Sequence, residues 1–263
     1  MAVGLLIIGD EILSGKRQDK HLSKAIEILG ERGIELAWAE YLGDDPQRIT
    51  ATLRRTFATK DVVFSFGGIG ATPDDHTRQC AAAALGLALE LHPEAKTLIL
   101  ERMRDVAAEQ RLPFEPDRAD NLHRLNMGVF PAGATLIPNP YNKIPGFSVG
   151  HVHFVPGFPV MAWPMIEWVL DRRYAHLHGG ARTVERSVIV FGAMEASLTP
   201  LMEDIETRFP GVKVFSLPSG DHPQWGRHIE LGVKAAVDPA EAFAALRAGL
   251  QQSGVRLGAE MVR

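Results

Sequence analysis

The chain has 263 residues, of which 46% are hydrophobic and 23% are charged, and this is ordinary for a globular protein. Its formal net charge of −4 argues against a general nucleic-acid-binding protein, which usually has a basic excess, and its apolar content excludes disorder throughout the chain. The length predicts one large domain or two unequal ones.

The first part of the chain alternates predicted strands and helices. The run Val3–Gly9 is apolar and ends in glycine, as is typical of a buried parallel strand. Strands are predicted at Val3–Gly9, Ile34–Gly43 and Asp61–Phe66, and helices at Asp19–Arg32 and Pro46–Phe57. This β-α-β-α-β order predicts a parallel sheet with helices on both of its faces.

The alternation of predicted strands and helices continues to about residue 175, and a domain boundary is predicted near residues 176–182. In the first part, further helices are predicted at Thr77–Leu87, Pro93–Arg111, Pro116–Met127 and Val160–Tyr174, with short strands and turns in Pro131–Gly157. After this boundary, strands are predicted at Thr183–Phe191, Val212–Leu217 and Arg227–Ala236, and helices at Glu195–Arg208 and Pro239–Ser253. We therefore predict a three-layer α/β/α domain over residues 1–176 with a mostly parallel sheet. A smaller α+β domain is predicted over residues 183–263.

Two polar motifs follow the first and third predicted strands. The first is Gly9-Asp10-Glu11-Ile12-Leu13-Ser14-Gly15, with Asp19 opening the next helix, and the second is Gly67-Gly68-Ile69-Gly70-Ala71-Thr72-Pro73-Asp74-Asp75-His76-Thr77. Ligands of open parallel sheets bind outside the carboxyl ends of the strands, so both motifs are expected at one site. Three glycines in four residues allow backbone N–H groups to approach a phosphate, next to the N-terminus of a helix that begins around Asp75. The carboxylates would repel a bare phosphate, so a divalent cation such as Mg²⁺ is expected between them.

A simpler interpretation of these motifs is also open. Glycine pairs after strands are common in turns, and an Asp-x-x-Thr stretch at a helix start can be only a cap. The second motif is not a Walker loop, because no Gly-Lys-Ser/Thr follows it, and Gly-x-Gly-x-x-Gly is absent after the first strand. The convergence of two carboxylate-rich loops favours a functional site.

Together the two motifs resemble the molybdopterin-binding (molybdenum cofactor biosynthesis) domain superfamily. More closely, they resemble the amino-terminal part of the competence/damage-inducible protein A (CinA-like) family. Further matching elements are Asn139, Pro145-Gly146-Phe147, Pro156-Gly157-Phe158-Pro159 and Phe191-Gly192 with Glu195-Ala196. His21 stands where the family usually has Asn, and Val160-Met161 where it usually has Glu. No segment resembles the carboxyl-terminal amidase domain of full-length members, so pyridine-nucleotide deamidation is not expected.

The resemblance implies a nucleotide or pterin phosphate as the ligand, and molybdopterin is one candidate. It also implies two kinds of function. One is a metal-dependent enzyme that hydrolyses a pyrophosphate such as ADP-ribose, and the other is a non-catalytic binding or carrier protein. The candidate catalytic residues are Asp75, Asp74, Asp10 and Glu11, and Asp10 and Asp75 are the candidate metal ligands. The candidate ligand-binding residues are Gly9, Ser14, Asp19, Gly67, Gly68, Ile69, Gly70, Thr72, Thr77, Pro145 and Gly146.

Within the second motif, Asp75 is expected to matter more than Asp74. Asp75 aligns with the aspartate of the superfamily's Asp-x-Thr element, and Thr77 and the first-turn amides are expected to hold its carboxylate. Elsewhere, His151 and His153 share one face of a predicted strand, but a third metal ligand is not apparent nearby. They are therefore more simply explained as structural residues.

The partners and the cellular location are predicted from absences and from charge. The longest run of apolar or glycine residues, Cys80–Leu89, is shorter than the ~18 residues that span a bilayer, and the amino terminus has no basic leader. One cysteine forms no internal disulfide, which fits a cytoplasmic protein. Residues 183–263 contain 8 Lys and Arg against 10 Asp and Glu, so we expect no nucleic-acid partner. We expect a small-molecule ligand, no membrane, and a homo-oligomer, either a dimer or a trimer.

Overall fold

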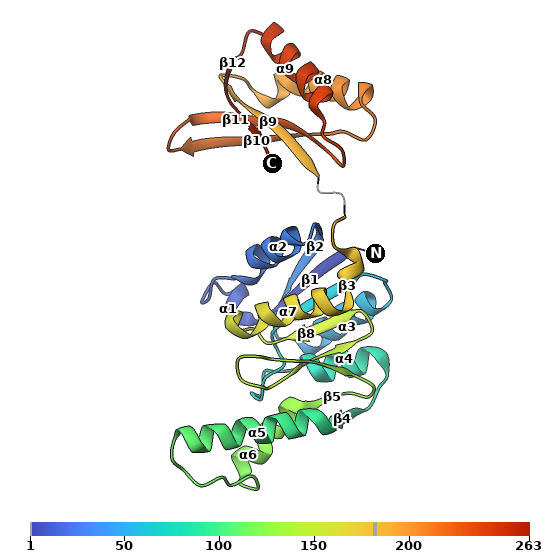
Figure 1. Cartoon of the computed structure of the whole chain (residues 1–263), viewed down its shortest axis with the longest axis vertical. Helices are drawn as coiled ribbons and strands as arrows, with labels where there is room; N and C mark the ends of the chain where they lie inside the picture. Colours follow the sequence, from blue (N-terminus) through green and yellow to red (C-terminus); the bar gives the residue numbers. More distant parts are fainter. Residues whose placement is uncertain (1, 181–182) are drawn as a thin grey trace. The chain divides into compact units, whose positions relative to one another are not determined.

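The computed structural model describes residues 2–180 and 183–263, which form two compact units: Met1–His178 (unit 1) and Gly179–Arg263 (unit 2) (Figure 1). None of the helices in this described part of the chain combines the length and the apolar character needed to span a bilayer.

Unit 1 is built on a six-stranded sheet in the order β2-β1-β3-β8-β7-β6. The strands are β1 (Val3–Ile8), β2 (Leu36–Leu42), β3 (Val62–Phe66), β6 (Thr135–Ile137), β7 (Gly146–Val149) and β8 (Val152–Val155). The four strands β2, β1, β3 and β8 are parallel, and the β8–β7 and β7–β6 pairs are antiparallel. The carboxyl ends of β1, β2 and β3 therefore meet at one edge of the sheet.

Helices cover both faces of this sheet, and β1 is therefore buried along its whole length. Leu5 and Ile7 pack with α2 (His21–Glu31) and α7 (Pro159–Arg173) on one face. Leu6 and Ile8 pack with α3 (Pro46–Phe57) and α4 (Thr77–Leu85) on the other. Side chains alternate between the faces of a strand, so one continuous apolar run supplies both cores.

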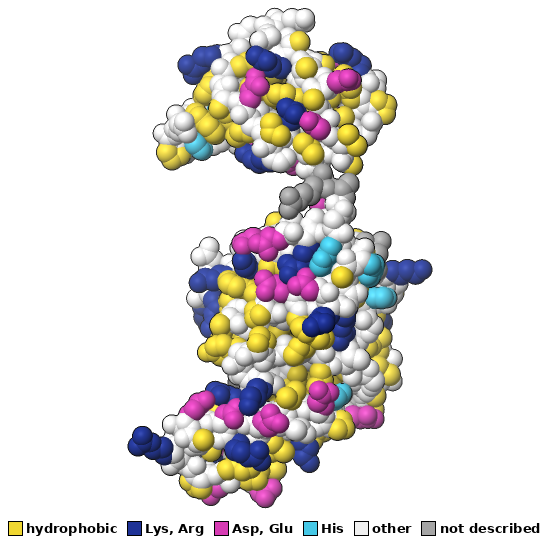
Figure 2. All heavy atoms as spheres, viewed as in Figure 1, with side chains coloured by type: hydrophobic (Ala, Val, Ile, Leu, Met, Phe, Trp, Pro, Cys, Tyr) yellow, Lys and Arg dark blue, Asp and Glu magenta, His cyan; other side chains and the backbone are white. Residues whose placement is uncertain are grey.

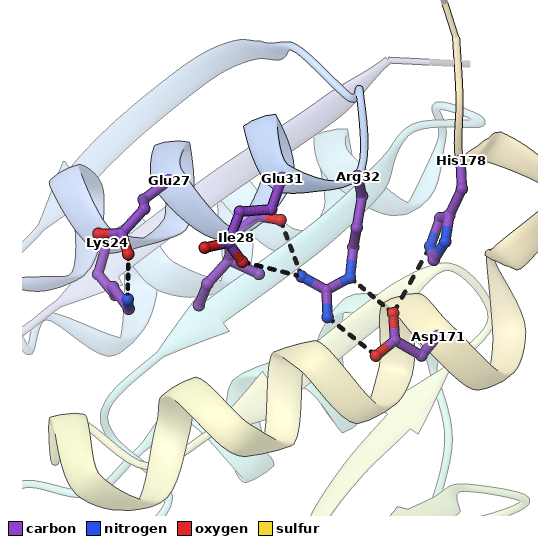
Figure 3. Close-up of polar contacts among 7 residues, drawn as sticks. All are labelled: Lys24, Glu27, Ile28, Glu31, Arg32, Asp171 and His178. Atoms are coloured by element: carbon purple, nitrogen blue, oxygen red, sulfur yellow. Dashed lines mark hydrogen bonds and ion pairs between the residues drawn. The ribbon is translucent and has the colours of Figure 1, made fainter.

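The first helical layer is linked by a charged pair. Arg32, which follows α2, donates two hydrogen bonds to the Asp171 carboxylate of α7, at 2.6 and 2.9 Å (Figure 3). A third guanidinium N–H donates to the Ile28 carbonyl oxygen at 2.9 Å. This paired arrangement lowers the pKa of Asp171 and raises that of Arg32.

The middle of unit 1 forms an excursion beyond the sheet. It contains α5 (Pro93–Glu109), α6 (Ala119–Arg124), a 3₁₀ turn at Leu125–Gly128, and a two-stranded sheet of β4 (Leu89–Leu91) and β5 (Val129–Pro131). Acidic and basic side chains are interspersed over the region of α5 and α6 (Figure 2). The sequence predicted one helix over Pro116–Met127, which is wrong: α6 is shorter and tightens into the 3₁₀ turn before Val129 turns extended.

Unit 2 is a four-stranded antiparallel sheet in the order β10-β11-β9-β12, packed against two helices. Its elements are β9 (Val184–Phe191), α8 (Glu195–Arg208), β10 (Lys213–His222), β11 (Gly226–Ala235), α9 (Ala240–Gln252) and β12 (Arg256–Val262). The sequence analysis missed β12, in which the apolar residues are interrupted by Gly258 and Glu260. The predicted fold class, an α/β unit with a mostly parallel sheet and a smaller α+β unit, is confirmed.

Candidate ligand-binding site

A cavity of about 400 Å³ lies at the carboxyl edge of the unit 1 sheet. Most of the candidate residues line it: Gly9, Glu11, Gly67, Gly68, Ile69, Gly70, Thr72, Asp74, Asp75 and Pro145. The two predicted motifs therefore meet at one site. Asp10, Ser14, Asp19, Thr77 and Gly146 lie outside the lining, and their positions are described below.

Two glycines of the second motif are required by close contacts. Gly67 and Gly68 have φ of +95° and +69°, a region that favours glycine. A Cβ on Gly67 would lie 2.3 Å from the Ile8 carbonyl oxygen, and one on Gly68 would lie 2.1 Å from Thr77 Oγ1. The Thr77 hydroxyl donates to the Gly67 carbonyl oxygen at 3.1 Å, and the Thr77 N–H to that of Gly68 at 2.9 Å. Thr77 thus holds the loop from behind and does not line the cavity.

The next carbonyl oxygens of the loop are also engaged. The buried Arg78 guanidinium donates to the Ile69 oxygen. His123 Nε2, from α6, lies 2.8 Å from the Ala71 oxygen, and since a carbonyl oxygen only accepts, this nitrogen carries the proton. Because the carbonyl groups of residues 67, 68, 69 and 71 are bonded to α4 and α6, the orientation of the peptide groups is fixed.

The N–H groups of residues 68–71 have no such partners. No hydrogen bond found among the described residues uses them as donors, whereas the Gly67 N–H donates to the Val155 oxygen at 3.0 Å. The Thr72 N–H donates to the Asp75 carboxylate at 2.8 Å. The four successive amides of residues 68–71, on a loop that lines the cavity, are therefore available to a ligand.

Asp75 is held differently from the expectation. Its Oδ2 accepts the Thr72 N–H and, at 2.5 Å, the Thr72 hydroxyl, so the carboxylate folds back over the loop. The predicted contact with Thr77 is wrong, because Thr77 is bonded to the two glycines and α4 begins only at residue 77, with His76 as its N-cap. A Cβ on Gly70 would lie 2.6 Å from Asp75 Oδ2, so this glycine leaves room for the carboxylate.

The first motif brings a carboxylate that the sequence analysis missed. The Asp10 N–H donates to Asp44 Oδ2 at 2.9 Å, and the Asp44 N–H donates to Asp10 Oδ1 at 3.2 Å. Asp44 lines the cavity, and Asp10 does not. Burial raises the pKa of Asp44, the Asp10 N–H opposes this, and the charges of Asp10, Glu11 and Asp74 raise it further. Its position after the second strand, in Gly43-Asp44, was the available signal.

No group of three or more His, Cys, Asp or Glu side chains in the described ranges is arranged to share a metal ion. The expected metal ligands are Asp10 and Asp75, and a carboxylate oxygen of each already accepts a hydrogen bond from the protein. The donors are the N–H groups of Asp44 and Thr72. His153 is enclosed between Ser148 Oγ at 2.8 Å and the Tyr174 hydroxyl at 2.9 Å, and it is therefore a structural residue.

The remaining candidates outside the lining have structural positions. Asp19 accepts the N–H groups of His21 and Leu22 at 2.8 and 3.1 Å, and the Tyr41 hydroxyl at 2.8 Å, so it starts α2. Ser14 is exposed at the end of the short helix α1 (Asp10–Leu13). Gly146 is buried in β7, where a Cβ would lie 2.4 Å from the Phe154 oxygen.

A further wall of the cavity is formed by loops that contain Asn139, Pro145 and Pro156-Gly157-Phe158, which the resemblance to the family had singled out. Buried Asn139 donates to Asn142 Oδ1 at 2.8 Å and to the Ile144 oxygen at 2.9 Å, which shapes this loop. Gly157 packs against Gly67, with a position for Cβ 3.4 Å from Gly67 Cα. Apolar side chains of this wall and its neighbours complete the lining: Ile144, Pro145, Pro156, Phe158 and Met161. The cavity thus joins amide donors, carboxylates and an apolar wall.

Comparison with known proteins identifies the family. Residues 4–176 match the family described as a probable molybdopterin binding domain. The chain belongs to this molybdopterin-binding domain family. The chain is 31% identical over 218 residues to a CinA-like protein of Syntrophotalea carbinolica, covering 79% of this chain and 50% of that protein. It is 33% identical over 211 residues to a CinA-like protein of Anaeromyxobacter sp. strain Fw109-5, covering 77% of this chain and 48% of that one.

The chain therefore spans about half the length of these curated CinA-like relatives. Among solved structures, the protein CinA from Thermoplasma acidophilum is similar, with a TM-score of 0.54 and 23% identity. That alignment covers 65% of this chain and 98% of that chain. It supports the fold of the molybdopterin-binding domain, and the resemblance inferred from the two motifs is confirmed.

Proposed function

We propose that unit 1 binds a phosphorylated nucleotide or pterin and, with a divalent cation, hydrolyses a pyrophosphate bond such as that of ADP-ribose. The observation that carries the proposal is the set of unbonded N–H groups of residues 68–71 on a loop that lines the cavity. Successive backbone amides of a glycine-rich loop form a favourable environment for a phosphate. The description of the family as a probable molybdopterin binding domain supports a pterin ligand.

The remaining walls suit the rest of such a ligand. A volume of about 400 Å³ is within the range of cavities that bind small organic ligands. Ile144, Phe158 and Met161 offer an apolar surface to a pterin or nucleobase ring. Arg17, which also lines the cavity, offers a positive charge to a second phosphate.

A divalent cation would be held by one or two carboxylates of the cavity together with the phosphate groups of the ligand. Glu11, Asp44 and Asp74 line the same cavity as the free amides. Burial, and after it the charges of Asp10, Glu11 and Asp74, raise the pKa of Asp44. Mg²⁺ commonly takes one or two carboxylates and completes its coordination with phosphate oxygens and water. Such a cation supplies charge neutralisation at the leaving phosphate and a more acidic bound water. We assign the positioning of Asp44 to Asp10, through their reciprocal hydrogen bonds.

The chemical step is an attack of water on one phosphorus atom. A new P–O bond forms, the bond from that phosphorus to the bridging oxygen breaks, and the proton lost by water leaves to a base or to solvent. For ADP-ribose the products are AMP and ribose 5-phosphate. Asp74 and Asp75, beside the amide loop, are the residues we assign to orienting the water, and the amides of residues 68–71 hold the phosphate that is attacked.

The experiment incubates the full chain with ADP-ribose and either Mg²⁺, Mn²⁺ or a chelator, and quantifies AMP by ³¹P NMR. Metal-dependent formation of AMP is expected. In parallel, a thermal-shift screen measures the binding of nucleotides and pterin phosphates. Binding without turnover of any pyrophosphate would establish the alternative, a non-catalytic binding or carrier protein. If neither binding nor turnover occurs, the proposed function is refuted.

A further inference from the structure

A second cavity, of about 480 Å³, adjoins the first one. The two share Ala71, Thr72 and Asp75 as a common wall. Its polar residues come from the beginning of α4 and from the segment of α6 and its 3₁₀ turn: His76, Arg78, Gln79, His123 and Asn126. Pro73, Leu89 of β4 and Val129 of β5 complete the lining. These polar side chains belong to the second cavity and not to the first.

The unusual feature of this cavity is Arg78. Its side chain lines the cavity, although the residue is only 4% exposed. A guanidinium has five N–H donors, and the one hydrogen bond found for it among the described residues goes to the Ile69 carbonyl oxygen. Within the described residues, no carboxylate oxygen lies within 4.0 Å of the Arg78 guanidinium as an ion-pair partner. Buried charges are normally paired, because removing an ion from water costs several kcal/mol.

Asp75 compensates this charge only in part. Burial lowers the pKa of Arg78, and the charge of Asp75 opposes that effect without cancelling it. The Asp75 Oδ2 atom is already bonded to the N–H and hydroxyl groups of Thr72. Arg78 therefore has donors and positive charge that the protein itself leaves incompletely matched.

We propose that the cavity around Arg78 is a second binding site, which takes an oxyanion of a small organic molecule, either a phosphate or a carboxylate. The planar guanidinium suits two oxygens of such a group. His76 and Gln79 lie on the same wall and supply further donors. The volume exceeds that of a bare ion, so the oxyanion is one end of a larger molecule.

The neighbouring histidine is held by a hydrogen bond at each ring nitrogen. His123 Nε2–H donates to the Ala71 oxygen, which leaves Nδ1 to accept from the Asn126 amide at 3.3 Å. The ring thus ties α6 to the loop that separates the two cavities. The proposal itself does not depend on the proposed hydrolysis.

The experiment titrates the ¹⁵N-labelled full chain with inorganic phosphate and, separately, with acetate, and follows two groups of NMR signals. The side-chain Nε–H of Arg78 and the amides of residues 76–79 report on the second cavity. The amides of residues 68–71 report on the first. We expect saturable shifts of the Arg78 Nε–H signal. The anion that binds with the lower Kd, phosphate or acetate, identifies the group that the site prefers.

Two variants test the role of the guanidinium. Arg78→Lys keeps the charge but loses the planar fork, and should weaken anion binding by about tenfold at the second cavity. The matched control Arg104→Lys changes an arginine of α5 that lies over the Phe114 ring and should leave binding unchanged. His76→Ala leaves the bond from Arg78 to Ile69 intact and should weaken binding less than Arg78→Lys.

The outcomes separate this proposal from the proposed function. If the amides of residues 68–71 respond while Arg78 and residues 76–79 do not, the second site is refuted and the first stands. If Arg78 responds but Arg78→Lys binds as well as the natural chain, the anion is only adventitious and the proposal fails. If Arg78 responds and the amides of residues 68–71 bind no phosphate, the second site stands without the first.

Discussion

The buried His153 should make the stability of unit 1 depend on pH. It lies in β8 with 0% exposure, between Ser148 Oγ and the Tyr174 hydroxyl. Burial, followed by the charges of Arg173 and His151, lowers its pKa to about 3. In the unfolded chain the same imidazole titrates near its ordinary value of about 6.5. Protons therefore bind to the unfolded state first.

The sign and the size of the effect follow from this difference. Between about pH 6.5 and about pH 3 the unfolded state holds one more proton at His153, so the free energy of unfolding falls as the pH is lowered. Each pH unit in that window costs about 1.4 kcal/mol, so acidification to about pH 5 should remove about 2 kcal/mol. Above about pH 7 the contribution of His153 to this slope vanishes.

The assay is urea unfolding at several pH values, followed by the fluorescence of the unit 1 tryptophans. His153→Gln removes the titrating group, and it should show a smaller loss of unfolding free energy on acidification than the natural chain. The comparison uses the difference in slope, because burial also lowers the pKa of His21. His176→Gln is the matched control, since that imidazole is exposed and is not among the groups that lower the pKa of His153. Equal slopes for the natural chain and His153→Gln would refute the reasoning.

Three further predictions concern the candidate site. Asp75→Asn should lower metal-dependent binding or hydrolysis by about tenfold or more, and Asp74→Asn by clearly less, because the Asp75 carboxylate is fixed by two bonds; an equal or reversed ranking in parallel assays contradicts this. Gly68→Ala should reduce phosphate binding in NMR titrations and lower the free energy of unfolding of unit 1 by more than the ~1–2 kcal/mol expected for Gly133→Ala. Gly133 has a similar positive φ, but no atom lies within 4 Å of a Cβ placed there, so equal losses of unfolding free energy would contradict the loop contacts. Asp44→Asn should weaken the Mn²⁺-dependent enhancement of ligand binding by about tenfold, measured by calorimetry with and without metal.

The parts of the fold that the sequence predicted are those with local causes. The apolar run of β1 and the Asp45-Pro46 start of α3 each depend on neighbouring residues, and both form as expected. Asp45 accepts the Arg48 N–H at 2.8 Å, as an N-cap should. By contrast, β4 and β5 are three residues each and exist because they pair with one another across about 40 positions. No local pattern indicates such a pairing.

The candidate site shows the same division. The sequence predicts that the glycine loop and the carboxylates meet, because parallel strands place their carboxyl ends at one edge. It does not predict which carboxylate faces the cavity. Across 34 positions, the backbone N–H of Asp10 and that of Asp44 each donate to the other residue's carboxylate, and this exchange decides that Asp44 lines the cavity.

The orientation of the amide loop depends on long-range contacts of the same kind. Thr77 and Arg78 look like ordinary first-turn residues of a helix, yet they hold three successive carbonyl groups of the loop. His123, 52 positions away, holds a fourth. These bonds satisfy the carbonyl oxygens of residues 67, 68, 69 and 71. The N–H groups of residues 68–71 are left without an acceptor among the described residues. A buried or half-buried donor without a partner is unfavourable, so a stable loop of this form implies an acceptor supplied by water or by a ligand. The phosphate-binding assignment follows from this arrangement rather than from the glycines alone.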